Sequence, residues 1–454
     1  MTKEGMGDGR DWDNAMDGTD FATYLPLAPD GAVFHVAAGT YKPVYDKELN
    51  VPEDSSKLTL FIQSGVTIKG GYPANATDEV ESNPELYKTI FESESIYKNR
   101  TSYPIFVVNL DGKNVTFDGL YIVHSCAGYG GVTFDAPNST IRFNKLYSTE
   151  NDGYILDGSG DNCQVIVENS FFYDNETRAI RLLGVKSLDI KNTSFRDNFG
   201  YEDYIFINSR DLKERKGSYV RIDSSSFYNI HNALCFLTVK NIAKVEVENV
   251  LFDSLQLDDD NIFYFDNIDT ILFERSEVSR LITHGDGIFT DGVDLLSFKD
   301  SRFTKCKCYN YLISMLANKG MIENSTFENC VMSTGALIFI ARSSSLSSVN
   351  STYVNNTLGE AIFYSVYGKC ELYNNTILSN NAPDNHSIYL VGDNELNLVG
   401  NVIDGIYLPS SSDPIISRNN IFLCDLSERG SGTVWANEEN AISLNASDCS
   451  DLFD

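Results

Sequence analysis

The stretch MIENSTFENC, from Met321 to Cys330, joins a few residues of alternating polarity to a turn. Residues 324–326, Asn-Ser-Thr, fit the acceptor pattern for N-linked glycosylation. The same shape returns about every 25 residues, with Asn at the turn and an apolar side chain three positions later. Asn also occupies this turn where neither Ser nor Thr follows two positions later, as at Asn169 and Asn249. We therefore interpret Asn324 as the corner residue of a repeat.

The corner residues form a column through most of the chain. Ser224, Arg275, Asp300 and Gly400 fill the corners between the asparagines, whose predicted ladder comprises Asn144, Asn169, Asn192, Asn249, Asn324, Asn350, Asn374 and Asn419. Asn tolerates the left-handed conformation of a sharp corner, and stacked Asn side chains can hydrogen-bond to one another. Three positions further on, every residue is apolar or aromatic, which indicates stacked rings in a core.

The residues before each corner alternate with a period of two, as in Val245 and Val247. Such alternation is typical of a strand with one buried face. A period of about 25 residues with several short strands predicts a parallel β-solenoid, and the chirality of parallel connections makes it right-handed. The sequence thus predicts an all-β chain, a single right-handed parallel β-helix of about 13 coils with a short helical cap at its N-terminus.

The ends of a solenoid need caps, because each end exposes the core. We expect residues 1–30 to form the N-terminal cap, with Ala15, Phe21, Tyr24 and Leu25 covering the first coil. Residues 31–425 form the β-helix in this prediction, and residues 426–454 form a partial coil or a C-terminal cap.

Composition excludes several functional classes. The chain has 454 residues and a formal net charge of −29, which opposes binding to nucleic acid or to an anionic membrane. No apolar run is long enough to span a membrane. Nine scattered cysteines do not suggest a disulfide scaffold. Cys306 and Cys330 are expected to be neighbours in adjacent coils, and we favour two free thiols over a bridge between in-register strands.

The N-terminal quarter carries a family resemblance. Gly7, Gly9, Trp12 and Ala15 form a Gly-x-Gly-x-x-Trp-x-x-Ala segment, followed by AAGTY at residues 37–41 and GGY at residues 70–72. With the coil pattern, these motifs resemble the pectate-lyase-like superfamily of right-handed parallel β-helices, and in particular surface proteins of Bacteroidetes that are described as adhesin-like. The resemblance implies an exported protein at the cell surface or outer membrane. The first residues lack the features of a signal peptide, so the sequence itself does not show that export signal.

Two stretches could carry polysaccharide chemistry. STENDGYILDGSGDN includes Asp152 and Asp157, and its Asp-Gly pairs resemble a polygalacturonase segment, although the other motifs of that family are missing. NETRAIRLLG supplies Arg178 and Arg181, which could pair with a substrate carboxylate in a shared groove. These four residues are the candidate catalytic group of a lyase or hydrolase, and ordinary corner residues and salt bridges are the alternative that we favour.

A second candidate region lies where the repeat is interrupted, between Asn192 and Ser224. The extra residues include Arg210, Lys213, Arg215 and Lys216, and insertions in repeat proteins often lie on a binding face. A solvated charged loop is the alternative.

The sequence predicts no metal site and no cofactor. Ca²⁺ remains an option at the acidic stretches around residues 258–260 and 286–291, but neither matches a calcium-binding loop.

Three hypotheses for function remain. We favour a non-catalytic surface module for adhesion that binds a polysaccharide or a host or bacterial surface glycan. The alternatives are a polysaccharide lyase or glycoside hydrolase acting on an extended chain, and a purely structural spacer.

Overall fold

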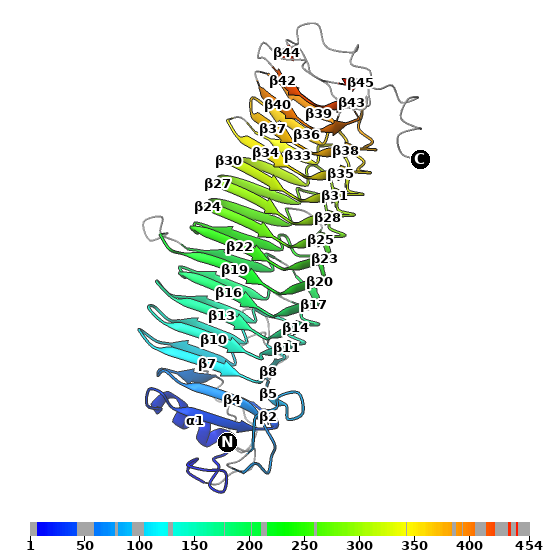
Figure 1. Ribbon diagram of the computed structural model, residues 1–454. Helices are drawn as coiled ribbons and strands as arrows, with labels where there is room; N and C mark the ends of the chain where they lie inside the picture. The colour runs from blue at the N-terminus through cyan, green and yellow to red at the C-terminus, as the bar shows by residue number, and fades with distance from the viewer. Residues whose placement is uncertain are drawn as a thin grey trace. The chain divides into compact units, whose positions relative to one another are not determined.

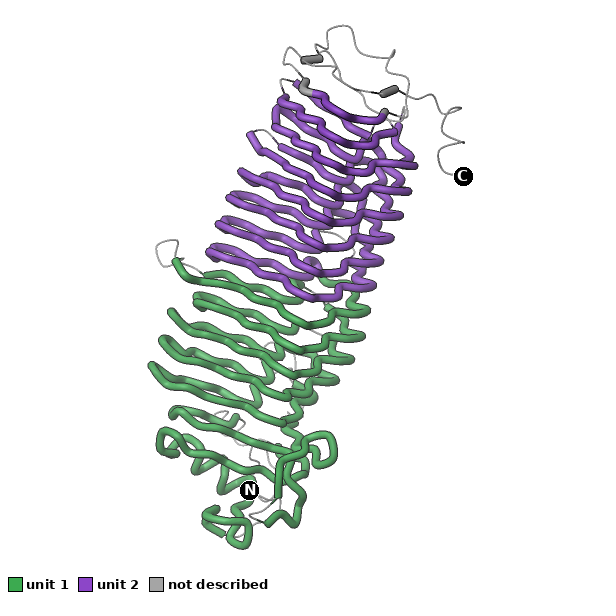
Figure 2. Tube along the Cα trace, in the orientation of Figure 1, with its two compact units in different colours: residues 1–233 green, residues 234–454 purple. Residues whose placement is uncertain are grey.

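The structure is a computed structural model, and it describes residues 7–42, 59–77, 80–92, 104–125, 130–176, 178–200, 202–209, 216–257, 261–341, 343–383, 387–392, 394–404, 415–422, 435–436 and 442–443. The chain divides into two compact units, Met1–Ala233 and Leu234–Asp454, which Figure 2 draws in green and purple. Within each unit the chain winds through three short strands per coil, and each strand pairs in parallel with its counterpart in the next coil (Figure 1).

The parallel pairings of unit 1 form three ladders, named here in the order in which a coil visits them. The first ladder contains β3 (Leu60–Ile62), β6 (Phe106–Asn109), β9 (Val132–Asp135), β12 (Leu156–Ser159), β15 (Ile180–Leu183) and β18 (Ile205–Asn208). The second contains β1 (Val33–Ala37), β4 (Thr67–Tyr72), β7 (Asn114–Asp118), β10 (Thr140–Asn144), β13 (Gln164–Glu168), β16 (Ser187–Lys191) and β19 (Tyr219–Asp223). The third contains β2 (Gly39–Tyr41), β5 (Thr89–Glu92), β8 (Leu120–Val123), β11 (Tyr147–Thr149), β14 (Phe171–Tyr173), β17 (Ser194–Phe199) and β20 (Ser226–His231).

Unit 2 repeats this arrangement, except that three long strands run through both the first and the second ladder: β24 (Phe263–Glu274), β27 (Ile288–Lys299) and β30 (Ile313–Glu323). The other strands of its first ladder are β21 (Leu237–Lys240), β33 (Ile338–Ile340), β36 (Phe363–Val366) and β39 (Ile388–Val391). The other strands of its second ladder are β22 (Lys244–Glu248), β34 (Ser345–Val349), β37 (Lys369–Tyr373), β40 (Glu395–Val399), β42 (Ile415–Arg418) and β44 (Trp435–Ala436).

The third ladder of unit 2 contains β23 (Leu251–Gln256), β25 (Glu277–Ser279), β28 (Arg302–Thr304), β31 (Thr326–Glu328), β35 (Thr352–Val354), β38 (Thr376–Leu378), β41 (Val402–Ile403), β43 (Ile421–Phe422) and β45 (Ile442–Ser443). A short additional series pairs the end of β23 with β26 (Ile282–Thr283), β29 (Lys307–Cys308) and β32 (Val331–Met332). The fold is therefore the expected all-β right-handed parallel β-helix, and its number of coils differs slightly from the 13 of the sequence prediction.

The corner residues adopt the left-handed backbone conformation. Asn324 has φ 50°, and its side-chain amide donates to the carboxylate of Asp300 in the neighbouring coil at 3.1 Å. The same conformation, with φ between 49° and 55°, is found at Asn169, Asn192, Asn249, Asn350, Asn374 and Asn419.

One corner lies one residue later than the column predicts. Asn144 is the last residue of β10, and the left-handed corner is Lys145, with φ 51°. Consequently Tyr147 pairs with Phe171 on the outward face, and Ser148, not Tyr147, aligns with the buried Phe172. The prediction was wrong because an Asn at the end of a strand looks, in the sequence, like the corner Asn that normally stands one residue later.

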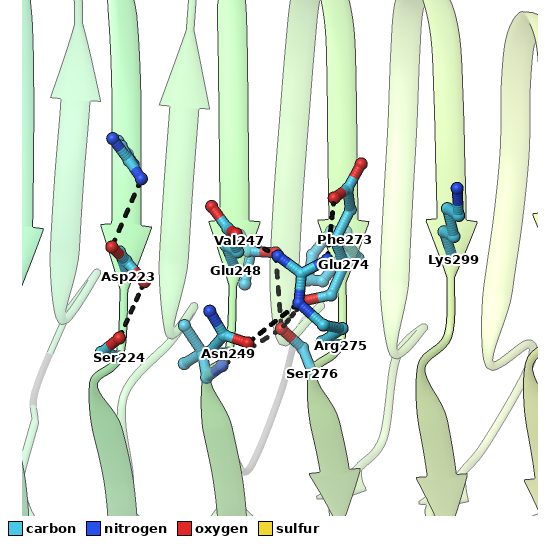
Figure 3. A network of polar contacts seen from close by, with 12 residues as sticks. Asp223, Ser224, Val247, Glu248, Asn249, Phe273, Glu274, Arg275, Ser276 and Lys299 are labelled. Atoms are coloured by element: carbon cyan, nitrogen blue, oxygen red, sulfur yellow. Dashed lines mark hydrogen bonds and ion pairs between the residues drawn. The ribbon is translucent and has the colours of Figure 1, made fainter.

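Where the corner is not Asn, other side chains bind the neighbouring coil. Arg275 has φ 48°, and its Nε donates to the side-chain oxygen of Asn249 at 3.1 Å. Its guanidinium also contacts Glu248 and lies 3.5 Å from a carboxylate oxygen of Glu274, as Figure 3 shows. A cation at this corner is thus neutralised by carboxylates at the ends of two adjacent strands.

From the corner Arg275 onward, the residue after each corner of unit 2 points inward, and these residues form a continuous polar series. Its members are Ser276, Ser301, Ser325, Ser351, Asn375, Asn401 and Asn420, and all are nearly or fully buried. Each backbone N–H donates to the side-chain oxygen of the next member, at 3.3 Å for the first step and 2.8 Å for the last. We call these residues the serine–asparagine series. It satisfies buried amides that the strand pairing leaves without a carbonyl partner.

Rings stack inside the coils. Phe303, Phe327 and Tyr353 are fully buried, with neighbouring centroids 4.9 and 5.1 Å apart and planes inclined by 4° and 5°. In-register pairing of β28, β31 and β35 places the three rings above one another. The predicted aromatic column is therefore a feature of the core, and it is continued by aliphatic side chains at other coils.

A short helix covers the start of unit 1. Helix α1 (Gly18–Tyr24) begins after Asp17, whose carboxylate accepts the N–H of Asp20 at 2.8 Å, and it leads into a 3-10 turn at Leu25–Leu27. Phe21 and Leu25 are buried, as expected. Tyr24 is 54% exposed and does not cover the first coil, because it lies on the outer side of this short helix.

The cysteines Cys306 and Cys330 are buried free thiols, in agreement with the sequence prediction. Burial raises the pKa of Cys306, because an apolar surrounding disfavours the thiolate. Of the predicted C-terminal segment, residues 426–454, nearly all lie outside the described residues, so the division at residue 425 stays a prediction.

Candidate functional site

The sequence-predicted cluster of unit 1 comes together around one tyrosine. In-register pairing of β12 and β15 places Asp157 beside Arg181, whose guanidinium donates to the Asp157 carboxylate at 3.0 Å. Arg178 lies before β15, contacts Glu202 and donates to the hydroxyl of Tyr154. The guanidinium carbons of Arg178 and Arg181 lie 5.1 and 5.5 Å from the centre of the Tyr154 ring. Asp157, Arg178 and Arg181 therefore each have a neighbour of opposite charge.

This pairing favours a structural interpretation of the cluster. A lyase would use a free cation or base, whereas the guanidinium of Arg181 already binds a carboxylate of the adjacent coil. Burial is the main influence on Arg178 and lowers its pKa, in keeping with a half-buried cation stacked on a ring. Asp152 is exposed at the turn before β12, where its backbone N–H donates to the carbonyl of Ser125 at 2.7 Å. Catalysis by these residues stays a prediction.

The basic interruption falls largely outside the described residues, which exclude Arg210, Lys213 and Arg215. Lys216 is described and exposed. For metal binding, the described part of the chain contains no group of three or more His, Cys, Asp or Glu side chains placed to hold an ion. Asp258–Asp260, one of the two acidic stretches considered for Ca²⁺, lie outside the described residues.

A row of outward-facing rings in unit 2 is the feature that the sequence analysis did not identify. Phe339, Tyr364 and Tyr389 are in register on β33, β36 and β39. Tyr311, just before β30, stacks on Phe339 with the centroids 4.7 Å apart and the planes inclined by 17°. The next two steps, to Tyr364 and then Tyr389, are 5.6 and 5.3 Å with tilted rings. We call these four side chains the aromatic row.

The row follows from strand alternation. Ile338 and Ile340 flank Phe339 and are fully buried, so the ring between them must face outward. In this register, the residue that pairs with Phe339 in the preceding coil is Ser314, which is 3% exposed. All four rings are half-buried, so each keeps one surface available to solvent.

A carboxyl group borders the row. Glu360 lies in the turn before β36, and its backbone N–H donates to the carbonyl of Gly335 at 3.0 Å. Gly335 keeps the space between this turn and Tyr311 open, since a Cβ there would lie 2.8 Å from Cδ1 of the Tyr311 ring. Burial raises the pKa of Glu360, and burial followed by the charge of Glu360 raises the pKa of Tyr311 to about 12. The carboxyl and the tyrosine ring therefore share one partly desolvated environment.

Unit 1 has a second, shorter set of outward rings on its third ladder. Tyr121, Tyr147 and Phe171 stack with centroids 4.4 and 5.4 Å apart, and Lys88 lies 5.3 Å from the Tyr121 ring. The last two rings help line a shallow groove of about 470 Å³, together with Glu85 and the corner residues of the neighbouring coils. An ammonium already covers one end of this set, where Tyr121 is 6% exposed.

A histidine links three coils near this groove. The two ring nitrogens of His124 lie 2.9 Å from a carboxylate oxygen of Glu92 and 2.8 Å from one of Glu150. Burial by itself would lower the pKa of His124, but the hydrogen bonds to Glu150 and Glu92 outweigh it and raise the pKa. The three side chains tie the end of β5 to the corners that follow β8 and β11.

The aromatic row could have been found from the corner column only with the exact loop length. Phe339 lies 11 residues before its corner Asn350, whereas Tyr364 lies 10 before Asn374. The bend between the first and second ladders thus differs in length by one residue. An alignment of the repeats at a fixed distance from the corner therefore does not place the rings in one column.

No helix in the described residues is long and apolar enough to cross a membrane. A family model described as "Right handed beta helix region" matches residues 65–213. No curated protein sequence matches the chain significantly.

Two solved structures align with most of this chain. The first is the A-module of the mannuronan C-5 epimerase AlgE6 of Azotobacter vinelandii, with 10% identity, 97% coverage of each chain and a TM-score of 0.30. The second is PfbA, a surface adhesin of Streptococcus pneumoniae, with 11% identity, 86% coverage of this chain and 92% of the other, and a TM-score of 0.34. The ladders, the corners and the family match over residues 65–213 identify the chain as a right-handed parallel β-helix.

Proposed function

We propose that the protein is a non-catalytic binding module for an extended polysaccharide, which lies along the aromatic row of unit 2. The single observation that carries this proposal is the row itself. Four half-buried rings on successive coils have centroid steps of 4.7, 5.6 and 5.3 Å. Binding sites combine aromatic surface with a few polar groups, and the apolar faces of sugar rings suit such a surface.

Charge narrows the class of polysaccharide. The chain carries a net charge of −29, and Glu360 lies beside the row. A polyanion would therefore be repelled, and we expect an uncharged or cationic chain. A structural spacer would have no use for a row of four half-buried rings on its outer face, which favours binding over the spacer hypothesis. Export and a surface location belong to the same proposal and rest on the family resemblance of the N-terminal residues.

The test is affinity electrophoresis or calorimetry with a panel of neutral, cationic and anionic polysaccharides. We expect the wild type to bind at least one uncharged or cationic chain, and Tyr364→Ala to weaken that binding by about 10-fold or more, as is usual for a central aromatic contact. The matched control is Tyr228→Ala, which removes a ring that is 39% exposed on β20 of unit 1.

Thermal unfolding of each variant shows whether a loss of binding reflects a loss of structure. The proposal is wrong if no member of the panel binds the wild type, or if a folded Tyr364→Ala variant binds as tightly as the wild type. Binding of anionic chains alone would contradict the charge argument and the proposal with it.

A further inference from the structure

We infer that Glu360 makes the aromatic row selective for polysaccharides whose sugars carry a protonated amine. This inference rests on the proposed function and names the substrate class of the same site. One carboxyl oxygen, Oε2, is buried and has no hydrogen-bond partner, and no lysine or arginine among the described residues forms an ion pair with this side chain.

Several other carboxylates that face outward from this unit are in a different situation. Glu371 on β37 lies 3.2 Å from the ammonium of Lys369, and Glu328 on β31 lies 2.8 Å from the guanidinium of Arg302. Their charges are balanced by residues of the protein. Glu360 instead contributes an uncompensated acidic group in a place that is partly shielded from water.

The titratable groups whose charges act on Tyr311 and Tyr364 are not cations. Besides burial, the charge of Glu360 raises the pKa of both Tyr311 and Tyr364. Asp286 also raises the pKa of Tyr311, and Tyr389 that of Tyr364. Asp286 is 6% exposed, and its carboxylate accepts the backbone N–H of Tyr311 at 3.2 Å. The described groups around the row are thus phenols and carboxyls, all of which attract a cation or are indifferent to it.

A ligand amine would satisfy both parts of this environment. An ammonium near Glu360 gains a charge-assisted hydrogen bond and removes the cost of a partly buried carboxylate without a partner. The same ammonium is attracted to the faces of the neighbouring tyrosine rings. A neutral hydroxyl gains a hydrogen bond only, and a carboxylate or sulfate on the ligand is repelled. The site therefore distinguishes amino sugars from acetylated or plain sugars.

A small quaternary ammonium compound would also suit one carboxyl beside two rings. It would leave most of the row unused, however, since the rings extend over successive coils from Tyr311 to Tyr389. A polymer with an amine on its sugars uses both the length of the row and the carboxyl at its side, and it is the occupant to which we commit.

The preference for a ligand amine depends on pH. Burial raises the pKa of Glu360, so its carboxylate becomes protonated at a higher pH than an exposed one. Preference for the amine requires the charged form. It is therefore lost as the pH falls through this raised pKa, while binding of an uncharged chain persists.

The experiment compares three hexasaccharides by calorimetry at about 150 mM salt, where long-range attraction to the acidic surface is screened. The probes are hexamers of glucosamine, N-acetylglucosamine and glucose with the same linkage. We expect the full-length wild type to bind the glucosamine hexamer about 10-fold more tightly than the other two, or more, as for a hydrogen bond between charged groups. Glu360→Gln should bind all three alike, and Glu371→Gln, which removes a charge of the same unit outside the row, should keep the preference.

The possible results separate the inference about Glu360 from the proposed function. If the glucose hexamer binds but the wild type shows no preference for the amine, or if Glu360→Gln keeps that preference, the inference is wrong and the proposed function stands. If no hexamer binds, the inference is wrong, and the polysaccharide panel decides on the proposed function. Competition by free choline, with no binding of the glucosamine hexamer, would show that the occupant is a small quaternary ammonium group and would overturn the inference.

Discussion

Ser325 stands in the middle of the apparent glycosylation pattern, directly after the corner residue Asn324. It is 1% exposed. Its hydroxyl donates to the carbonyl of Glu323 at 2.9 Å and accepts the backbone N–H of Ser301 at 3.2 Å. Its own N–H donates to the hydroxyl of Ser351 at 3.1 Å. A residue chosen by sequence as part of a modification site is thus a link between three coils.

Ser325→Ala should destabilise the protein by about 1–3 kcal/mol, because the buried N–H of Ser301 then has no acceptor. Denaturant unfolding followed by circular dichroism measures the change. Ser347→Ala, which truncates a half-buried serine on β34, is the control and should stay within about 0.5 kcal/mol of the wild type. Equal stability of the two variants would show that water or a backbone shift replaces the Ser325 hydroxyl at little cost.

At the scale of the strand, sequence periodicity predicted most of the fold. The alternation of Val245 and Val247 corresponds to buried positions of β22, and the left-handed corner at Asn249 follows directly after that strand. The predicted corner at Asn144 was wrong, because the left-handed residue is Lys145, although Asn144 still accepts the side-chain amide of Asn169 at 2.9 Å. The sequence prediction also missed the aromatic row, because outward positions are free to vary and only pairing in space shows that Phe339 adjoins Tyr364. Of the predicted site residues, Asp157, Arg178 and Arg181 do meet, but as ion pairs and cation–ring contacts.

Gly158 illustrates how one strand depends on its neighbour. The ring of Phe134 on β9 occupies the space where a side chain at Gly158 would lie, so close that an added Cβ would be 1.9 Å from the ring Cζ. Gly158→Ala should therefore destabilise the fold by about 1–3 kcal/mol through overpacking.

The measurement is again the free energy of unfolding. A double variant that also carries Phe134→Leu should recover part of the loss, because the smaller side chain frees the space. Gly18→Ala in helix α1 is the matched control, since its Cβ would meet nothing closer than 3.7 Å. A Gly158→Ala variant as stable as the control would contradict the close approach of the two strands.

At the scale of the whole molecule, charge opposes the folded state. The chain has 64 acidic and 35 basic residues, so at least 29 acidic groups remain after every basic residue is paired. Ion pairs between coils, such as Arg302 with Glu328 and Lys369 with Glu395, offset only part of this repulsion. Because exposed ion pairs contribute little each, the excess negative charge should dominate the response to salt.

The midpoint of thermal unfolding at neutral pH should therefore rise when NaCl is increased from about 10 mM to about 150 mM, where the Debye length falls from about 30 Å to about 8 Å. The same titration at about pH 4.5, where many exposed carboxyls are protonated, should show a smaller rise. A fall of the midpoint with salt at neutral pH would mean that the inter-coil ion pairs outweigh the repulsion.

The hydrogen bonds of the serine–asparagine series in unit 2 also follow the order in which the chain is synthesised. The N–H of Ser301 finds its acceptor on Ser325, which lies later in the chain, and the N–H of Ser325 finds its acceptor on Ser351, later again. During synthesis from the N-terminus, the newest coil therefore holds buried donors that cannot be satisfied until the following coil has been made. Completion of this unit should trail the growing end of the chain by about one repeat, and a nascent chain that stalls within it presents an unfinished edge to chaperones and to other nascent chains.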